Sequence, residues 1–183
     1  MMKEQSEFIM NNHPLINPET GKEEWISRAI AVVVFLFAED SYGDTYILVV
    51  NRGKGTPDPE FVGKYCVPCG YLDYNETITQ AAQRELVEET GINAPISDFK
   101  FVSINDNPKG DKRQNVTFRF RIDSNIYKEN LEQLLTINNS EKDEVASVRF
   151  INIKDIDMYE WAFNHEELIK KISTQKTQTT FDR

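Results

Sequence analysis

Cysteine is scarce in this chain, because only Cys66 and Cys69 among its 183 residues carry a thiol. Two closely spaced cysteines are too few for the disulfide framework of a small secreted protein, which favours a reducing environment. Long apolar runs are missing too: the longest, Ala29–Ala38, has ten residues, about half of what crosses a bilayer. The first residues also lack the basic-then-apolar order of a signal peptide. We therefore expect a cytoplasmic protein without a membrane partner.

Positive charge is in deficit as well. The chain has 21 Lys and Arg residues against 30 Asp and Glu residues, a formal net charge of −9. Binding to a nucleic-acid backbone depends on clusters of Lys and Arg, so we expect no nucleic-acid partner. A small phosphorylated molecule is compatible with this charge if a divalent cation supplies the positive charge at the contact.

The chain also lacks internal repeats and any long linker rich in proline, glycine or serine. Its hydrophobic content of 39% is that of an ordinary globular protein. The sequence therefore predicts a single domain over residues 1–183, with loosely ordered tails at 1–15 and 174–183. The composition leaves open whether the domain forms a homodimer.

Strand and helix patterns are mixed along the chain, which predicts an α/β domain with a mixed sheet flanked by helices. The run from Ala29 to Phe37 has no polar alternation, so we expect a strand that is covered on both faces. The other predicted strands begin near Trp25 or span Tyr46–Val50, Tyr65–Pro68, Phe99–Ile104, Val116–Ile122 and Val145–Ile151, and the predicted helices span Ile78–Thr90, Tyr127–Leu135 and Asn164–Ile172. Gly70–Glu76 is predicted as a polar turn, and the strands Phe99–Ile104 and Val116–Ile122 as a hairpin-like arrangement.

One predicted helix, Ile78–Thr90, carries an unusual arrangement of charge. Thr77 with Gln80 fits a capping box at its start, and Gly91 fits the left-handed position after its end. At about 100° per residue its apolar side chains form one stripe, and three glutamates fall in the same arc as that stripe. Amphipathic helices normally carry charge on the opposite side. The sequence therefore predicts three carboxylates that face the protein: Glu85, Glu88 and Glu89.

These carboxylates repel one another and need a positive partner. Arg84 is the only cation within the helix, and it can pair with Glu88 on one flank. A hard divalent cation fits better, and oxygen ligands favour Mg²⁺, Mn²⁺ or Ca²⁺ over Zn²⁺. The favoured hypothesis is a metal-dependent reaction at a phosphate. The alternative is a glutamate-rich helix end that faces water.

The same residues belong to a longer pattern. From Gly70 to Ile92 the sequence reads GYLDYNETITQAAQRELVEETGI. This stretch resembles the Nudix box, and the order of strands and helices in the rest of the chain is similar to that family too. Every position that the box specifies is filled, by Gly70, Glu76, Arg84, Glu85, Leu86, Glu88, Glu89, Gly91 and Ile92.

The resemblance implies a Nudix-type α/β/α sandwich and a hydrolase for the pyrophosphate linkage of a nucleoside diphosphate joined to another moiety, such as a sugar nucleotide or ADP-ribose. It implies that Glu76 and Arg84 support the site through charge interactions. The cation would bridge the diphosphate oxygens and activate the attacking water. The implied binding set for Mg²⁺ or Mn²⁺ is Gly70, Glu85, Glu88 and Glu89.

The general base is less well specified by the resemblance, because the family takes it either from the box or from a loop outside it. The acidic stretch Glu141–Glu144, just before the last predicted strand, is the best outside source. Glu144 is preferred because the adjoining strand fixes it better than Glu141. A solvated turn is the competing interpretation of the same residues.

Substrate contacts are predicted from residues around the box. Arg52 and Lys54 lie in a flexible stretch after a predicted strand and could contact a phosphate. Tyr71 could stack on a base or sugar. A surface loop and ordinary aromatic packing are the respective alternatives.

The CxxC sequence of Cys66 and Cys69 could form a redox pair or half of a zinc site. We expect neither, because a second CxxC is missing and one continuous strand would place residues three apart on opposite faces. Glycine is common in the family where Cys69 stands, so this position departs from the pattern.

Two further functions remain open within the resemblance. One is hydrolysis of a nucleoside triphosphate. The other is a nucleotide-binding sensor without turnover, whose expected marks are a broken carboxylate set or an appended DNA-binding module. The carboxylate set is complete, and the composition disfavours DNA binding.

Overall fold

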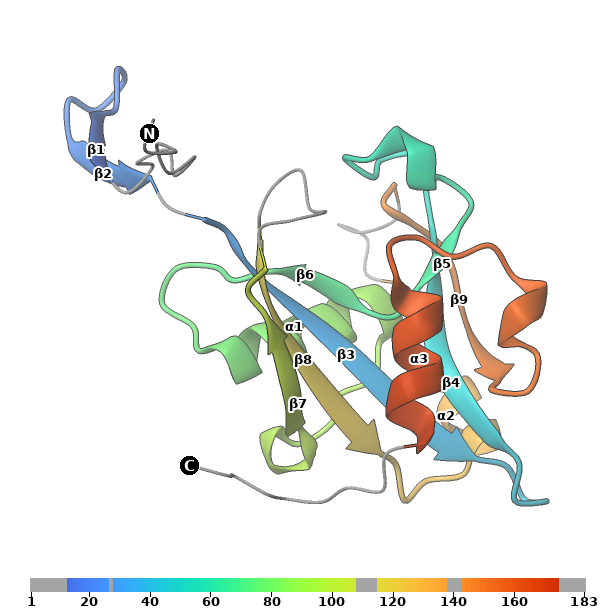
Figure 1. Ribbon diagram of the computed structural model, residues 1–183. Helices are drawn as coiled ribbons and strands as arrows, with labels where there is room; N and C mark the ends of the chain where they lie inside the picture. The colour runs from blue at the N-terminus through green and yellow to red at the C-terminus, as the bar shows by residue number, and fades with distance from the viewer. Residues whose placement is uncertain (1–12, 27, 108–114, 138–142, 175–183) are drawn as a thin grey trace, which may run out of the picture.

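The computed structural model describes residues 13–26, 28–107, 115–137 and 143–174. Figure 1 shows a sheet with one long helix on each face. The strands are β1 His13–Ile16, β2 Glu23–Ile26, β3 Ile30–Glu39, β4 Thr45–Arg52, β5 Tyr65–Cys66, β6 Cys69–Tyr71, β7 Lys100–Asn105, β8 Val116–Asp123 and β9 Val145–Asn152. The α-helices are α1 Ile78–Thr90, α2 Lys128–Glu132 and α3 His165–Thr174, and short 3₁₀ turns are η1 Pro59–Phe61, η2 Ile96–Asp98 and η4 Ile156–Met158.

Seven strands form the main sheet. The order is β5-β4-β3-β8-β7, with β6 also paired to β3 and β9 also paired to β4. Strand β3 runs parallel to β8 and antiparallel to β4 and β6. The sheet is therefore mixed, as the sequence predicted, and the predicted hairpin-like arrangement of β7 and β8 is confirmed by their antiparallel pairing.

Strand β3 is buried on both faces because each face is covered by a helix. Val32, Val34 and Leu36 pack in the core that contains Ala82 and Leu86 of α1. The alternate residues of β3 pack in a second core with Ile169 and Ile172 of α3. In Figure 1, α3 lies in front of the sheet and α1 behind it. This confirms the predicted two-sided burial of the strand.

The sheet opens between its two central strands. Strands β3 and β4 pair only where Phe37–Glu39 meets Thr45–Ile47. Beyond that point β6 lies beside β3, where Cys69 pairs with Val33, and β5 lies beside β4, where Cys66 pairs with Val50. The short segment Tyr65–Tyr71 therefore borders both halves of the opened sheet.

Two predictions about this part of the chain were wrong. Tyr65–Pro68 was predicted as one strand and Gly70–Glu76 as a polar turn. Instead the strand stops at Cys66, and a second strand, β6, begins at Cys69. Pro68 lacks an N–H and cannot continue an inner ladder, so the chain changes its partner from β4 to β3 at this residue.

Helix α1 has the bounds and both ends that the sequence predicted. The Thr77 side chain accepts a hydrogen bond from the Gln80 N–H, and the Gln80 side chain accepts one from the Thr77 N–H. Gly91 ends the helix with φ of 78°, a left-handed conformation that glycine adopts without a Cβ penalty.

The remaining helices are close to prediction. Helix α2 is shorter than the predicted Tyr127–Leu135, and α3 begins one residue after Asn164. No described helix has the length and apolar content that a bilayer crossing would need. Strands β1 and β2 form a separate two-stranded sheet whose first strand starts inside the predicted tail 1–15. The predicted tail after Thr174 lies outside the described residues.

Candidate functional site

A cleft of about 1180 Å³ opens beside α1 and the start of α3. It is lined on one side by carboxylates of α1 and on the other by side chains of the sheet and of the segment before α3. The cleft includes most of the residues that the sequence predicted to bind metal or substrate, namely Arg52, Gly70, Tyr71, Arg84, Glu85, Glu88, Glu89 and Glu144.

The three glutamates of α1 differ in their exposure. Glu89 is 7% exposed and lies on the same side as the buried Leu86. The side chains of Glu85 and Glu88 are 12% and 30% exposed. All three line the cleft, so the predicted inward orientation is confirmed and the alternative of a solvated helix end is wrong.

Arg84 is the counter-ion of this cluster. Its Nε and Nη2 donate to the two carboxylate oxygens of Glu76 at 3.1 and 2.8 Å. Its Nη1 donates to Glu85 at 2.7 Å and to Glu88 at 3.0 Å, and its Nη2 also donates to the Tyr71 carbonyl oxygen. The hydrogen bonds with Glu76 are the main reason why the pKa of Arg84 is raised. The predicted pairing with Glu88 is confirmed, but Arg84 also holds Glu85 and anchors β6.

Gly70 brings the backbone of β6 against Glu85. A Cβ built at this position would lie 2.1 Å from Oε1 of Glu85, far inside van der Waals contact. Only glycine allows this approach without displacing the carboxylate. The first glycine of the box is therefore required by the closeness of β6 to α1.

Glu89 has the most strongly perturbed carboxyl group of the cleft. It accepts a hydrogen bond from the Cys69 N–H at 3.0 Å. Burial raises the pKa of Glu89 well above its ordinary value, and nearby Cys69 and Glu85 add to this, while the hydrogen bond from Cys69 and the charge of Arg52 oppose it. Glu89 thus lies in a place where positive charge is in short supply.

These residues fit a hard divalent cation. The donors are all oxygen atoms, which Mg²⁺ and Mn²⁺ prefer, and the missing side chain at Gly70 lets the Glu85 carboxylate lie directly against the backbone of β6. Within the described part of the chain, no three His, Cys, Asp or Glu side chains already surround one point. Glu85 and Glu88 instead point to Arg84, so cation binding would require them to turn from Nη1, while Glu76 keeps its two hydrogen bonds to the guanidinium.

The predicted substrate contacts separate into two groups. Arg52 lines the cleft, where its guanidinium lies 5.3 Å from the centre of the Phe163 ring and donates to the Thr56 hydroxyl. Tyr71 also lines the cleft and is 40% exposed. Lys54 is exposed and is not among the residues that line the cleft, so the structure does not bring it to the site.

Glu144 lies at the edge of the cleft, immediately before β9. Its carbonyl oxygen accepts a hydrogen bond from the Gly53 N–H at 2.6 Å, and the Asp143 carbonyl oxygen accepts one from the Gly55 N–H at 2.6 Å. These bonds hold the backbone before β9 against the loop that follows Arg52. Glu141 lies outside the described residues.

The cleft also contains residues that the sequence did not point to, namely Arg119, Phe163 and His165. Arg119 belongs to a strand that alternates strictly between apolar and polar residues, and a polar strand face is normally expected to meet water. That face lies under α3 instead. Phe163 adopts a left-handed backbone with φ of 58°, which is rare for a bulky residue.

The geometry of the two cysteines differs from the prediction. Because the chain changes strands between them, Cys66 and Cys69 pack in one cluster rather than on opposite faces. The neighbouring Cys66 thiol and burial raise the pKa of the Cys69 thiol well above its ordinary value. A thiol held in its protonated form is a poor nucleophile, so this arrangement does not favour a redox pair.

His165 makes the stability of the fold depend on pH. It is 4% exposed, its Nδ1 accepts a hydrogen bond from the Val67 N–H at 3.2 Å, and burial lowers its pKa from 6.5 to about 3. The unfolded chain binds a proton at this residue below pH 6.5 and the folded chain does not, so stability is lost as the pH falls. We expect His165 to contribute a loss of about 2 kcal/mol between pH 7 and pH 5.

Urea unfolding of the parent and of His165→Gln at both pH values measures this term. The glutamine can accept the Val67 hydrogen bond but does not titrate, so the variant should lose about 2 kcal/mol less than the parent over the interval. Equal losses in the two proteins would contradict the assignment.

Comparison with known proteins adds a family and a fold. Residues 27–172 match the family model described as NUDIX domain. No curated protein matches the sequence. The NUDIX domain of Shewanella oneidensis NrtR complexed with ADP ribose shares 22% identity, with a TM-score of 0.66 over 86% of this chain and 91% of that one.

Two further solved structures are similar. A bifunctional NMN adenylyltransferase/ADP ribose pyrophosphatase from Francisella tularensis, complexed with AMP and a Mn ion, shares 23% identity, with a TM-score of 0.61 over 80% of this chain and 41% of that one. Shewanella oneidensis NrtR complexed with a 27mer DNA also shares 23% identity, with a TM-score of 0.58 over 78% of this chain and 59% of that one. At these identities the likeness concerns the fold alone, and it agrees with the predicted α/β/α sandwich.

Proposed function

The chain belongs to the NUDIX domain family, and from that premise we propose that it is a metal-dependent hydrolase. Its substrate is a nucleoside diphosphate joined to another moiety, of the sugar nucleotide or ADP-ribose type. The observation that carries this proposal is the inward placement of three glutamates on α1, one of them buried, along one wall of the cleft. Relatives complexed with ADP ribose, or named as an ADP ribose pyrophosphatase, support the substrate class.

The residues that would hold the cation, Mg²⁺ or Mn²⁺, are Gly70 through its carbonyl oxygen and Glu85, Glu88 and Glu89. When bound, such a cation polarises phosphoryl oxygens and neutralises the charge that develops on them. Arg84 remains fixed through Glu76 and, through its hydrogen bond to the Tyr71 carbonyl oxygen, keeps β6 beside α1. Arg52, opposite these carboxylates, offers a guanidinium to a phosphate oxygen.

The reaction needs a proton acceptor at the open edge of the cleft. A water oxygen attacks one phosphorus, the bond from that phosphorus to the bridging oxygen breaks, and the two products each keep one phosphate. Glu144 accepts the proton of the water, because it lines the cleft and its backbone is fixed to Gly53. This assignment follows from position, and Glu144→Gln tests it, because removal of the proton acceptor should lower kcat at least about 100-fold.

A product-release assay tests the proposal. Purified protein is incubated with ADP-ribose, several sugar nucleotides and the common nucleoside triphosphates, with Mg²⁺, with Mn²⁺ and with excess EDTA, and monophosphate release is measured. We expect release from at least one diphosphate derivative with either cation and none with EDTA. Inorganic pyrophosphate released from triphosphates only would establish the triphosphate alternative.

A sensor without turnover is the remaining alternative. It would bind ADP-ribose or another nucleotide without releasing product in any metal. NrtR, which shares the fold, was solved with ADP ribose and with DNA, so the sensor alternative is also tested by a DNA-binding assay. The absence of a nucleic-acid partner, a cytoplasmic location and the oligomeric state remain predictions for this chain.

A further inference from the structure

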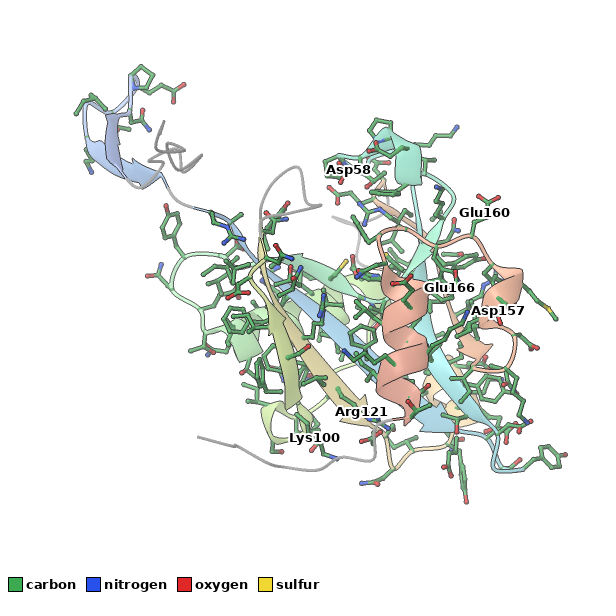
Figure 2. All side chains as sticks on the ribbon, in the orientation of Figure 1. Asp58, Lys100, Arg121, Asp157, Glu160 and Glu166 are labelled. Atoms are coloured by element: carbon green, nitrogen blue, oxygen red, sulfur yellow. The ribbon has the colours of Figure 1, made fainter. Side chains whose placement is uncertain are left out.

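Strand β8 carries two arginines on the face that α3 covers, and they differ in their partners. Arg121 forms an ion pair with Asp123 at 2.7 Å, donates to the Ile172 carbonyl oxygen and lies over the Phe37 ring. Figure 2 places Arg121 at the end of β8 near Lys100, and Arg121 is not among the residues that line the cleft. The side chain of Arg119, two residues earlier, has no ion pair or hydrogen bond among the described residues, and its Nε is buried without a partner.

Arg119 lines the cleft, and the strand register gives the distance of its backbone from that of Cys69. Val33 of β3 pairs with Cys69 on one side and with Arg119 on the other. Two strand spacings therefore separate the backbone of Arg119 from that of Cys69, about 10 Å. The Cys69 N–H donates to Glu89, and Cys69 is followed by Gly70. The paired residues Cys69, Val33 and Arg119 therefore extend across the sheet from the proposed metal site.

The surroundings of Arg119 do not neutralise its charge. His165 stands nearby and is neutral, with a pKa that the charges of Arg119 and Arg52 help to lower. Arg52 has its own partners, Thr56, the ring of Phe163 and the charge of Glu89. Burial lowers the pKa of Arg119, and no carboxylate compensates for that effect.

A partly desolvated arginine without a counter-charge costs stability, so an anion that binds beside it gains from the full donor set of the guanidinium. The diphosphate at the α1 side is the less suitable anion, because β3 and about 10 Å lie between the backbone of Cys69 and that of Arg119. A second anionic group on the substrate can reach Arg119 instead. The remaining possibility, direct contact of Arg119 with the scissile diphosphate, makes a different prediction and is separated below.

We infer that Arg119 is the recognition residue for a phosphate monoester carried by the substrate on the moiety away from the scissile pyrophosphate. This inference rests on the proposed hydrolase function and narrows its substrate class. Neutral sugars at the same place would leave the arginine without a partner, and they are therefore the poorer substrates.

Matched substrate pairs that differ by one phosphate test this inference. ADP-ribose is compared with its 2′-phosphate, and dephospho-coenzyme A with coenzyme A, by kcat/KM in the parent, Arg119→Gln and Arg119→Lys. We expect the parent to prefer one phosphate-bearing member, and Arg119→Gln to lower kcat/KM for that member about 10- to 100-fold while its dephosphorylated partner changes less than threefold. Lysine, which keeps the charge, should restore part of the preference.

The control is Arg149→Gln, because Arg149 is exposed on β9 outside the cleft and its loss changes the net charge equally. It should leave both members of each pair unchanged. If Arg119→Gln lowers kcat/KM equally for both members of a pair, Arg119 contacts the scissile diphosphate and the inference is overturned. The inference is also overturned if kcat/KM falls for neither member.

Failure of the proposed function is distinguishable from failure of this inference. If neither pair is hydrolysed with any divalent ion, titration calorimetry of the same four compounds decides. Tighter binding of a phosphate-bearing member that is lost in Arg119→Gln supports the recognition role without hydrolysis. Equal binding of both members of each pair to the parent overturns it.

Discussion

Glu89→Gln is expected to lower the turnover of the best substrate at least about 100-fold, as removal of a key charge-stabilising group commonly does. Glutamine keeps the size of the side chain and one oxygen that can accept the Cys69 N–H at the position of the present 3.0 Å bond. What it removes is the negative charge that lies buried against the cleft. Steady-state kinetics at saturating Mg²⁺ measures the effect, and Glu88→Gln should behave similarly.

The same substitution should leave the fold intact, which separates a loss of chemistry from a loss of structure. A buried carboxylate close to Glu85 costs folding free energy, and the neutral amide does not carry that cost. The unfolding free energy of Glu89→Gln in EDTA should therefore equal or exceed that of the parent. Glu160→Gln is the control, because Glu160 lies on the outer surface away from the cleft (Figure 2). Turnover of Glu89→Gln within threefold of the parent would remove Glu89 from the reaction.

Gly70→Ala is expected to reduce turnover about 100-fold, although it adds only one methyl group. The methyl would overlap the Glu85 carboxylate, whose Oε1 lies 2.1 Å from the ideal Cβ position. The carboxylate or the backbone of β6 must move by about an ångström, and displacements of that size in a catalytic site cost about 100-fold. The effect should appear in kcat, while the melting temperature falls by only a few degrees.

A double-mutant cycle shows whether the methyl acts through Glu85. In the Glu85→Ala background there is no carboxylate to displace, so adding Gly70→Ala should cost less than threefold further. Additive losses from the two substitutions would mean that Gly70 matters through its backbone alone and not through the space it leaves.

Local sequence signals predicted α1 closely because each of them acts within a few residues. The capping box at Thr77, the end at Gly91 and the arc of Glu85, Glu88 and Glu89 depend only on helix geometry, and all are confirmed. The partners of Arg84 were predicted in part, since the i+4 pairing with Glu88 is local. Its hydrogen bond to the Tyr71 carbonyl depends on where β6 lies, which no local pattern specifies.

Features that depend on distant strands were missed for the same reason. The change of partner strand at Pro68 follows from the separation of β3 and β4, and it brings Cys66 and Cys69 together. The alternation of apolar and polar residues predicts the strand β8, but periodicity alone does not show whether the polar face of a strand meets water or lines a cleft. Arg119 and His165 line the cleft because α3 covers this face of the sheet, and no local pattern predicts that packing.

The short segment that joins the two halves of the opened sheet couples the width of the cleft to its chemistry. Tyr65 and Cys66 are tied to β4, and Cys69 to Tyr71 are tied to β3. Only Val67 and Pro68 lie between these anchors, and such a short tether has little slack. A bulky ligand that increased the separation of β3 and β4 would therefore displace the Cys69 N–H, which donates a hydrogen bond to Glu89. A wide group on a ligand would in this way shift the Glu89 carboxylate, even if that group does not contact it.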